Sequence, residues 1–241
     1  MPNSQIIVSK LQKFFSKREF KKAVIGLSGG VDSALTLAIA VKALGAENVF
    51  GLILPQKEIS SEDSKKLASK VARQFGVKTF EFEISEVLEQ LKFPWSENQL
   101  AKINLAPRLR MLALYHFANS QNALVLGTSN KSEILLGYGT KFGDFAADVE
   151  VLGNLWKTEV FEMAKEFGIP DEIIARPPTA ELLSGQTDET ELGASYEILD
   201  EILQKLEKND FKLPAKSTDF EKTILARVIQ NRHKTELPPV L

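Results

Sequence analysis

Two glycines, two serines and an acid follow a short apolar run near the start of the chain. In the stretch AVIGLSGGVDSAL, Ser28, Gly29 and Gly30 form a turn, and Asp32 and Ser33 open a segment with helical character. Glycines let backbone N–H groups approach an anion without obstruction by a side chain. The start of a helix adds partial positive charge. The pattern therefore predicts a binding site for phosphate groups.

Asp32 is the unexpected member of this site, because its carboxylate repels phosphate. A magnesium ion between the carboxylate and the phosphates resolves this conflict, so the residues predict a magnesium–pyrophosphate site. The stretch differs from the lysine-containing Walker loop, since no Gly-Lys-Ser/Thr follows the glycines. A simple strand-to-helix turn, with Asp32 or Ser33 as the helix cap, is the alternative interpretation.

The apolar pattern predicts how these residues are positioned. Strand-like runs cover residues 23–28, 49–55, 77–84 and 123–128. Helical patterns cover residues 4–16, 31–44, 61–75, 107–120, 130–137, 157–169, 194–208 and 217–232. Strands and helices alternate from residue 23 to residue 137, which predicts an α/β fold with a doubly wound, Rossmann-like parallel sheet and helices on both faces. In such sheets ligands bind beyond the carboxyl ends of the strands, where residues 28–33 and 128–133 both fall.

Two segments lack regular patterning. Residues 137–156 contain four glycines, which indicates a functional loop or a disordered segment. Residues 176–193 are also irregular. Within them, Asp188 and Glu191 predict a capping box that opens the helix at 194. A gate over the site is a second role for the stretch QTDETELG. No repeat or linker interrupts the chain, so a single domain over residues 1–241 is expected.

Composition limits the classes of function. The formal net charge is −2 over 241 residues, which gives the whole protein no electrostatic reason to coat nucleic acid or an anionic membrane. The absence of cysteine excludes disulfides, thiolate metal sites and a cysteine nucleophile. Neither a secretory leader nor a membrane-spanning run is evident, so a cytoplasmic location is expected.

The stretch SGGVDS resembles the signature of the ATP pyrophosphatases, which transfer AMP to an oxygen atom and then displace it with a nitrogen or sulfur nucleophile. Five further segments are similar, in this order, to the ammonia-dependent NAD synthetases: PRLRM, LGTSNKSEILLGYGTKFGD, RPPTAEL, GQTDETELGASYEILD and HKTELPPV. The resemblance covers most of residues 20–241. It implies the adenine nucleotide alpha hydrolase-like fold and the ATP-dependent amidation of deamido-NAD by ammonia. That reaction passes through an adenylated intermediate and releases AMP and pyrophosphate.

The resemblance also implies roles for individual residues. The implied ATP contacts are Gly26, Ser28, Gly29, Gly30, Asp32, Ser33, Thr128, Lys157 and Thr179. The implied deamido-NAD contacts are Arg108, Lys141, Asp148, His233 and Lys234. Asp32 and Glu133 are the implied ligands of a magnesium cofactor, and Asp32, Lys157 and Asp144 are the implied catalytic residues, with Asp144 holding an ammonium ion or accepting its proton.

Two positions have local features that bear on these roles: Lys157, and Phe145 next to Asp144. Lys157 opens a helix, where the dipole disfavours a cation, which indicates an anionic partner. Phe145 stands where the family commonly has glycine, which predicts either a stiffer loop or packing of the ring.

The family is homodimeric, and the helices at 4–16 and 107–120 are either dimer faces or ordinary core. No glutaminase domain is expected, so ammonia is expected from solution or from a separate subunit. Another ATP pyrophosphatase, such as the synthetase part of a GMP synthetase, is the alternative enzyme, although TKFGDFAAD and RPPTAEL speak against it. A nucleotide-binding sensor without turnover is the alternative from another class.

Overall fold

The structure is a computed structural model and describes residues 4–182, 187–214 and 216–240. Its centre is a parallel sheet in the order β3-β2-β1-β4-β5. The strands are β1 Lys22–Gly26, β2 Val49–Ile53, β3 Lys78–Glu81, β4 Ala123–Gly127 and β5 Val149–Glu150. The direction of strand addition reverses between β1 and β4, which places a crevice at the carboxyl ends of these two strands. The predicted doubly wound sheet is confirmed.

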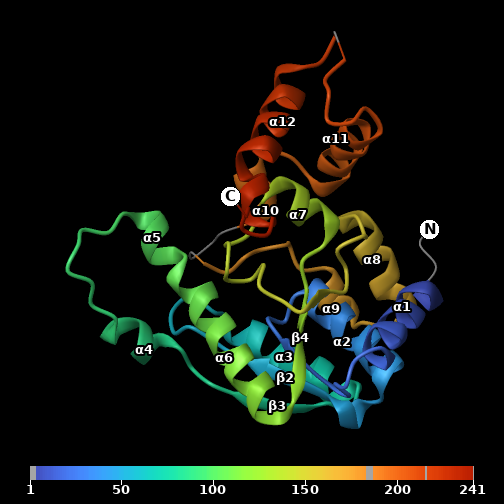
Figure 1. Cartoon of the computed structure of the whole chain (residues 1–241), viewed down its shortest axis with the longest axis vertical. Helices are drawn as coiled ribbons and strands as arrows, with labels where there is room; N and C mark the ends of the chain where they lie inside the picture. Colours follow the sequence, from blue (N-terminus) through green and yellow to red (C-terminus); the bar gives the residue numbers. More distant parts are fainter. Residues whose placement is uncertain (1–3, 183–186, 215, 241) are drawn as a thin grey trace.

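Helices cover both faces of the sheet (Figure 1). One face carries α1 Ser4–Ser16, α2 Val31–Leu44, α3 Glu62–Gln74 and α8 Lys157–Glu166. The other face carries α4 Ser85–Gln90 and α6 Leu105–Gln121. The remaining helices are α5 Gln99–Ile103, α7 Lys131–Leu136, α9 Asp171–Ile174, α10 Asp188–Leu192, α11 Tyr196–Lys208 and α12 Asp219–Asn231, with short 3-10 turns at Ala46–Asn48 and Arg232–Lys234.

Alternation along the strands divides the core between the two faces. On β1, Ala23 and Ile25 join the cluster under α1, α2 and α8, while Val24 joins the cluster under α6. Helix α2 is buried on nearly every side over residues 33–40, as its alanine-rich sequence predicts. A buried helix directly after β1 fixes the turn between them, which is the turn that carries Ser28 to Gly30.

A separate group of buried side chains lies in the C-terminal half. Helices α7, α10, α11 and α12 pack around Leu199, Leu203 and Ile224, and α11 and α12 form a lobe at one end of the molecule (Figure 1). We call α10, α11 and α12 the helical lobe. The lobe packs against α7, which contains Glu133, and against α8, which begins at Lys157.

Some expectations about local structure need correction. Residues 137–156, expected to be a functional loop or a disordered segment, are irregular except for the two-residue strand β5, which pairs with β4. The predicted Asp188–Glu191 capping box is wrong: Thr187 caps α10, and the helix that follows begins at Tyr196. The predicted gate is the stretch QTDETELG, residues 186–193, and its residue 186 lies outside the described residues. Among the helices that the structure describes, none is long and apolar enough to cross a membrane.

Candidate active site

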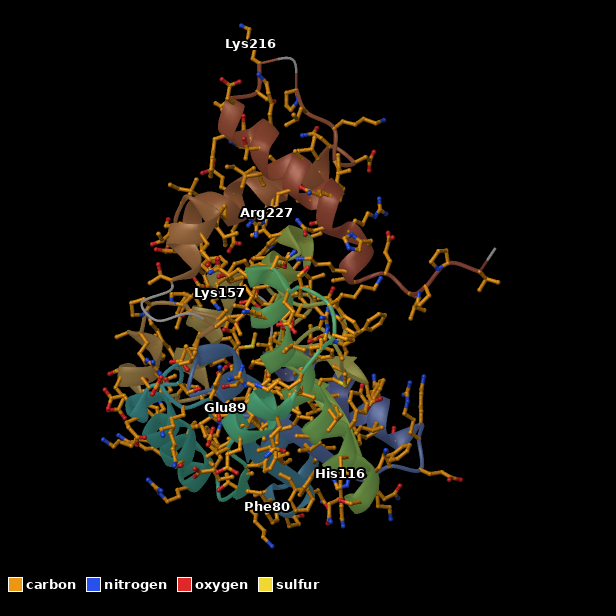
Figure 2. All side chains as sticks on the ribbon, turned by 90° about the vertical axis from the view of Figure 1, so that its left-hand side faces the viewer. Phe80, Glu89, His116, Lys157, Lys216 and Arg227 are labelled. Carbon is orange, nitrogen blue, oxygen red and sulfur yellow. The ribbon has the colours of Figure 1, made fainter. Side chains whose placement is uncertain are left out.

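A cleft of about 720 Å³ opens beyond the carboxyl ends of β1 and β4. Its walls include most of the residues singled out in the sequence: Gly26, Ser28, Gly30, Asp32, Ser33, Arg108, Thr128, Glu133, Lys141, Asp144, Lys157, Thr179, His233 and Lys234. Lys157 lies near the middle of the molecule, between the lobe that carries Arg227 and the sheet end marked by Phe80 (Figure 2). The chain therefore brings residues from five separate motifs to one cleft.

The turn after β1 is held by its own serines. The Gly30 N–H donates to Ser28 Oγ at 3.2 Å, and Ser33 Oγ donates to the Gly30 carbonyl at 3.0 Å. Gly29 has φ +83°, and a Cβ placed there would lie 2.3 Å from the carbonyl oxygen of Ser64 on α3. Only glycine fits this close approach, so contact with α3 fixes the turn, and its neighbours Ser28 and Gly30 line the cleft.

Two carboxylates from different strand ends meet at one cation. Lys157 Nζ lies 2.6 Å from Asp32 Oδ2 and 3.1 Å from Glu133 Oε1, and its side chain is 2% exposed. Asn130 joins the same group, because its Nδ2 donates to Asp32 Oδ1 at 2.9 Å while its Oδ1 accepts from the Glu133 N–H. The anionic partners expected for Lys157 are thus present, and within the chain they are protein carboxylates.

The charges in this group are unevenly stabilised. Burial raises the pKa of Glu133 to about 8, against the opposing effect of the nearby Lys157 ammonium. Burial also lowers the pKa of Lys157, but Asp32 and Glu133 outweigh this effect, so its net pKa is raised and the ammonium stays charged. With both carboxyl groups ionised, two negative charges face one ammonium, so a further cation beside Glu133 would favour its ionised form and lower its pKa.

A divalent cation with oxygen ligands fits these side chains. In the part of the chain that the structure describes, no cluster of three or more His, Cys, Asp or Glu residues could hold a metal. The pair of carboxylates, Asp32 and Glu133, matches what magnesium commonly uses, since it binds through one or two carboxylates and takes its remaining ligands from substrate phosphates and water.

Arg176 connects the RPPTAEL segment to the turn formed by Ser28, Gly29 and Gly30. Its Nη2 donates to Ser64 Oγ at 2.9 Å and pairs with Glu181 at 3.2 Å, and its Nη1 lies 3.4 Å from the Gly29 carbonyl. Thr179 Oγ1 accepts from the Glu181 N–H at 3.1 Å. The segment that follows α9 is therefore tied to the turn, although the sequence reasoning did not single out Arg176.

Arg108, Lys141, His233 and Lys234 also line the cleft, and we call this part of its lining the basic wall. Lys234 Nζ donates to the carbonyls of Gly137 and Gly139 at 2.8 and 3.2 Å, and Lys141 Nζ donates to the His233 carbonyl at 2.5 Å. Arg108 Nε lies 3.4 Å from the Lys141 carbonyl. The C-terminal turn thus holds the glycine-rich loop and concentrates positive charge next to it.

Asp144 sits in that loop beside a glycine that makes room for it. Its Oδ1 accepts from the Thr140 N–H at 2.9 Å, and a Cβ at Gly139 would lie 2.5 Å from its Oδ2 and 2.6 Å from the Phe145 ring. The ring therefore packs against Gly139. Desolvation raises the pKa of Asp144, opposed by the Thr140 hydrogen bonds and by the charge of Lys234.

Asp148 is placed differently from the other predicted dinucleotide contacts. Its Oδ2 accepts from the Val125 N–H at 2.7 Å, and its own N–H donates to the Val125 carbonyl. It is not among the residues that line the cleft. In this structure the carboxylate stabilises the edge of β4, next to the site.

Residues that support the site were not found from the sequence. Asn130 carried a usable signal, since an Asn followed three residues later by Glu marks a capping box, and the structure forms one at α7. Ser132 and Asp200 carried none, because their contact spans 68 residues of chain.

Comparison with known proteins agrees with this geometry. The NH3-dependent NAD+ synthetase of Methanococcus aeolicus is 47% identical over 87% of this chain and 86% of its own length. That of Methanocaldococcus jannaschii is 42% identical over 97% and 95%. Among solved structures, an NMN synthetase from Francisella tularensis matches with a TM-score of 0.86 and 31% identity, covering 99% of this chain and 96% of that one. The NH3-dependent NAD synthetase from Campylobacter jejuni matches with a TM-score of 0.81 and 31% identity over the whole of both chains.

The match to a family model extends the agreement to nearly the whole chain. The model described as NAD synthase aligns with residues 4–238. This range includes the turn after β1, the carboxylates of Asp32 and Glu133 beside Lys157, and the basic wall. With this match and these relatives, the chain belongs to the NAD synthase family.

Proposed function

We propose that this protein is a ligase that amidates deamido-NAD with ammonia and ATP, giving NAD, AMP and pyrophosphate. The observation that carries the proposal is the contact of Lys157 with both Asp32 and Glu133, next to the glycine turn and inside the cleft. This arrangement offers a cation, a pair of metal-binding carboxylates and a phosphate cradle at one point. The relatives named NH3-dependent NAD+ synthetase support the same reaction.

The reaction needs positioning and charge stabilisation more than a protein nucleophile. An oxygen of the nicotinate carboxylate attacks the α-phosphorus of ATP, which forms an acyl-adenylate and releases pyrophosphate. Ammonia then attacks the carbonyl carbon, the bond to the AMP oxygen breaks, and a proton leaves the nitrogen as the amide forms. Oriented cations and N–H donors stabilise the charge that develops on the phosphates.

On this proposal the ATP end of the cleft is the end at β1. The backbone at Gly29 and Gly30, with Ser28 and Ser33, would hold pyrophosphate, and Lys157 would offset its charge. The other ATP contacts would be Gly26, Thr128 and Thr179. Asp32 and Glu133 would hold magnesium, which when bound neutralises phosphate charge and orients the phosphates.

The dinucleotide end lies along the basic wall. Arg108, Lys141, His233 and Lys234 would contact deamido-NAD, and the positive charges of Arg108, Lys141 and Lys234 suit its pyrophosphate. Asp148 supports this wall through β4 and would reach the dinucleotide only at its margin. Asp144 would hold the incoming ammonium ion and accept its proton, because its raised pKa suits a base that exchanges protons.

We also propose that residues 1–241 act as a single synthetase domain that uses free ammonia, and that two copies form a homodimer in the cytoplasm, where ATP is available. The matched relatives named for ammonia span similar lengths, with 86% and 95% of their chains covered. A glutamine-dependent NAD+ synthetase from Acinetobacter baumannii aligns over only 46% of its own chain.

The experiment measures NAD and AMP together, with ATP, magnesium and ammonium present. Equal amounts of the two products with deamido-NAD as acceptor are expected. The likeness to an NMN synthetase makes nicotinate mononucleotide the essential comparison acceptor. Preference for the mononucleotide would transfer the proposal to that substrate, and AMP release only with xanthosine monophosphate would support a GMP synthetase activity. The absence of AMP with every acceptor, despite ATP binding, would indicate a sensor.

A further inference from the structure

The first turn of α8 depends on groups from two other helices. The Lys157 N–H donates to Ser132 Oγ of α7 at 2.9 Å, and the Thr158 N–H donates to Asp200 Oδ2 of α11 at 3.0 Å. A helix normally satisfies these first N–H groups with an oxygen from its N-cap residue. Here that residue is Trp156, whose indole is a donor only. Glu159 of α8 itself accepts from the Trp156 N–H at 2.9 Å, but the acceptors for the Lys157 and Thr158 N–H groups come from outside the helix.

Asp200 is the centre of this arrangement. Its Oδ1 accepts from the Ser132 hydroxyl at 2.5 Å, and its Oδ2 also accepts from the Thr158 hydroxyl at 2.9 Å. Ser132 is fully buried and Asp200 is 2% exposed. A buried carboxylate that makes three hydrogen bonds to fixed donors holds its partners rigidly, because breaking any one of them leaves a polar group unsatisfied. The lobe helix α11 is thereby joined to α7 and α8.

The position of this pair relates it to the active site. Ser132 immediately precedes Glu133, and the Ser132 hydroxyl accepts from the backbone of Lys157. The Ser132 hydroxyl therefore ties the backbone of Lys157 to the residue next to Glu133. Lys157 and Glu133 are the pair whose side chains lie 3.1 Å apart in the cleft. Side-chain geometry at a buried site depends on such backbone supports.

We propose that Ser132 and Asp200 are positioning residues, which fix the backbone of Lys157 against that of Glu133 so that the Lys157 ammonium is aimed at the phosphates of ATP. The inference rests on the proposed role of Lys157 in binding ATP. On this inference the helical lobe contributes to the reaction through Asp200, which supports Lys157 and does not itself touch the substrate.

The test begins with Ser132→Ala and a matched control. Ser4→Ala removes a hydroxyl that is 5% exposed and donates to the Glu166 carboxylate at 2.5 Å, far from the cleft. With ATP and magnesium, Ser132→Ala is expected to raise the dissociation constant for ATP by about 10- to 100-fold, the effect usual for supporting partners of a site. The affinity for adenosine is expected to stay unchanged, since adenosine has no phosphates. Ser4→Ala should leave both affinities unchanged.

A double-mutant cycle shows whether the effect passes through Lys157. In a Lys157→Met background, Ser132→Ala is expected to cause no further loss of ATP affinity, because the positioned ammonium is absent. An equal loss in both backgrounds would overturn the inference, as would an equal loss of ATP and adenosine affinity in the single variant. If Ser132→Ala does not fold, Asp200→Asn takes its place, since the amide keeps one oxygen for the Thr158 N–H.

The same variants separate this inference from the proposed function. If the wild-type protein binds ATP but makes no NAD from deamido-NAD, the proposed function fails, and the cycle in ATP affinity still decides the role of Ser132. If the wild-type protein makes NAD and Ser132→Ala behaves like Ser4→Ala, only the positioning role fails.

Discussion

At the scale of single residues, Lys157 balances the charge of the site. Its removal leaves the carboxylates of Asp32 and Glu133 facing each other without their shared cation, and removes a donor for phosphate. Lys157→Met is therefore expected to lower kcat/KM for ATP by about 100-fold or more, the magnitude found when one charge-stabilising donor is removed. Steady-state rates of AMP release measure this change.

Lys131→Met is the matched control for that variant. Lys131 pairs with Glu207 at 2.7 Å and lies over the Trp156 ring, but its side chain is on the lobe side of α7, outside the residues that line the cleft. Its loss should leave kcat/KM nearly unchanged. Equal losses in the two variants would mean that positive charge around α7, and not the contact in the cleft, supports the reaction.

Glu150 carries a second prediction, about stability and pH. Burial raises its pKa to about 8 from an ordinary value of 4.5, and its Oε1 has no hydrogen-bond partner. A carboxyl whose pKa is higher in the folded state holds its proton longer there. Its contribution to the free energy of unfolding is thus present below the unfolded pKa and is lost as the pH rises through about 8.

Glu150→Gln is neutral at every pH and keeps the shape of the protonated acid. Thermal melting of both proteins between pH 5 and pH 9 should show a smaller fall in Tm for the variant, so that its relative stability improves as pH rises. Parallel Tm profiles for the two proteins would contradict the assigned pKa.

At the scale of elements, the position of the turn between β1 and α2 depends on its close contact with α3. Gly29→Ala forces α3 away, since the new Cβ would lie 2.3 Å from the Ser64 carbonyl. A displacement of this kind at a positioned site costs about 100-fold in activity. Gly29→Ala should therefore lower Tm and weaken ATP binding together, as measured by thermal melting with and without ATP.

Gly168→Ala is the control for backbone strain alone. Gly168 has φ +69°, close to the +83° of Gly29, but a Cβ there meets nothing within 4 Å. It should cost only about 1–2 kcal/mol of left-handed strain and leave ATP binding intact. Similar losses of ATP affinity in both variants would show that contact with α3 is unimportant.

The elements also show what the sequence can and cannot predict. Strand β1 and helix α2 were predictable because a short apolar run is followed directly by a long run rich in alanine and leucine. The place of Asp32 in the cleft was predictable because it follows the glycine turn at the end of a strand. Asp200 was not, since its partners lie 42 and 68 residues away. Asp188 was misjudged because its carboxylate bonds to Tyr196 within the fold instead of capping a helix.

At the scale of the whole molecule, the proposed homodimer can be assigned to a face. Leu91, Trp95, Leu100 and Leu112 are large apolar side chains exposed on the segment from α4 to α6, on one side of the molecule (Figure 1). Because contiguous exposed apolar surface marks interaction sites, we propose this segment as the face that would form the homodimer. Leu112→Glu, at a position 60% exposed, is expected to shift the protein from twice its 26.8 kDa mass to a monomer in sedimentation.

Ile229→Glu on α12 is the control, because Ile229 is 64% exposed on the helical lobe. It should leave the sedimenting mass unchanged. A dimer that survives Leu112→Glu but not Ile229→Glu would move the interface to the lobe.

The central claim is that AMP is transferred to the carboxylate of deamido-NAD in this cleft. The most direct measurement uses deamido-NAD whose nicotinate carboxylate oxygens are both oxygen-18, with ATP, magnesium and ammonium. One labelled oxygen per NAD formed should be found in AMP, because the oxygen that attacks phosphorus leaves with AMP when ammonia displaces it. Label in pyrophosphate or phosphate, or AMP without label, would contradict the account.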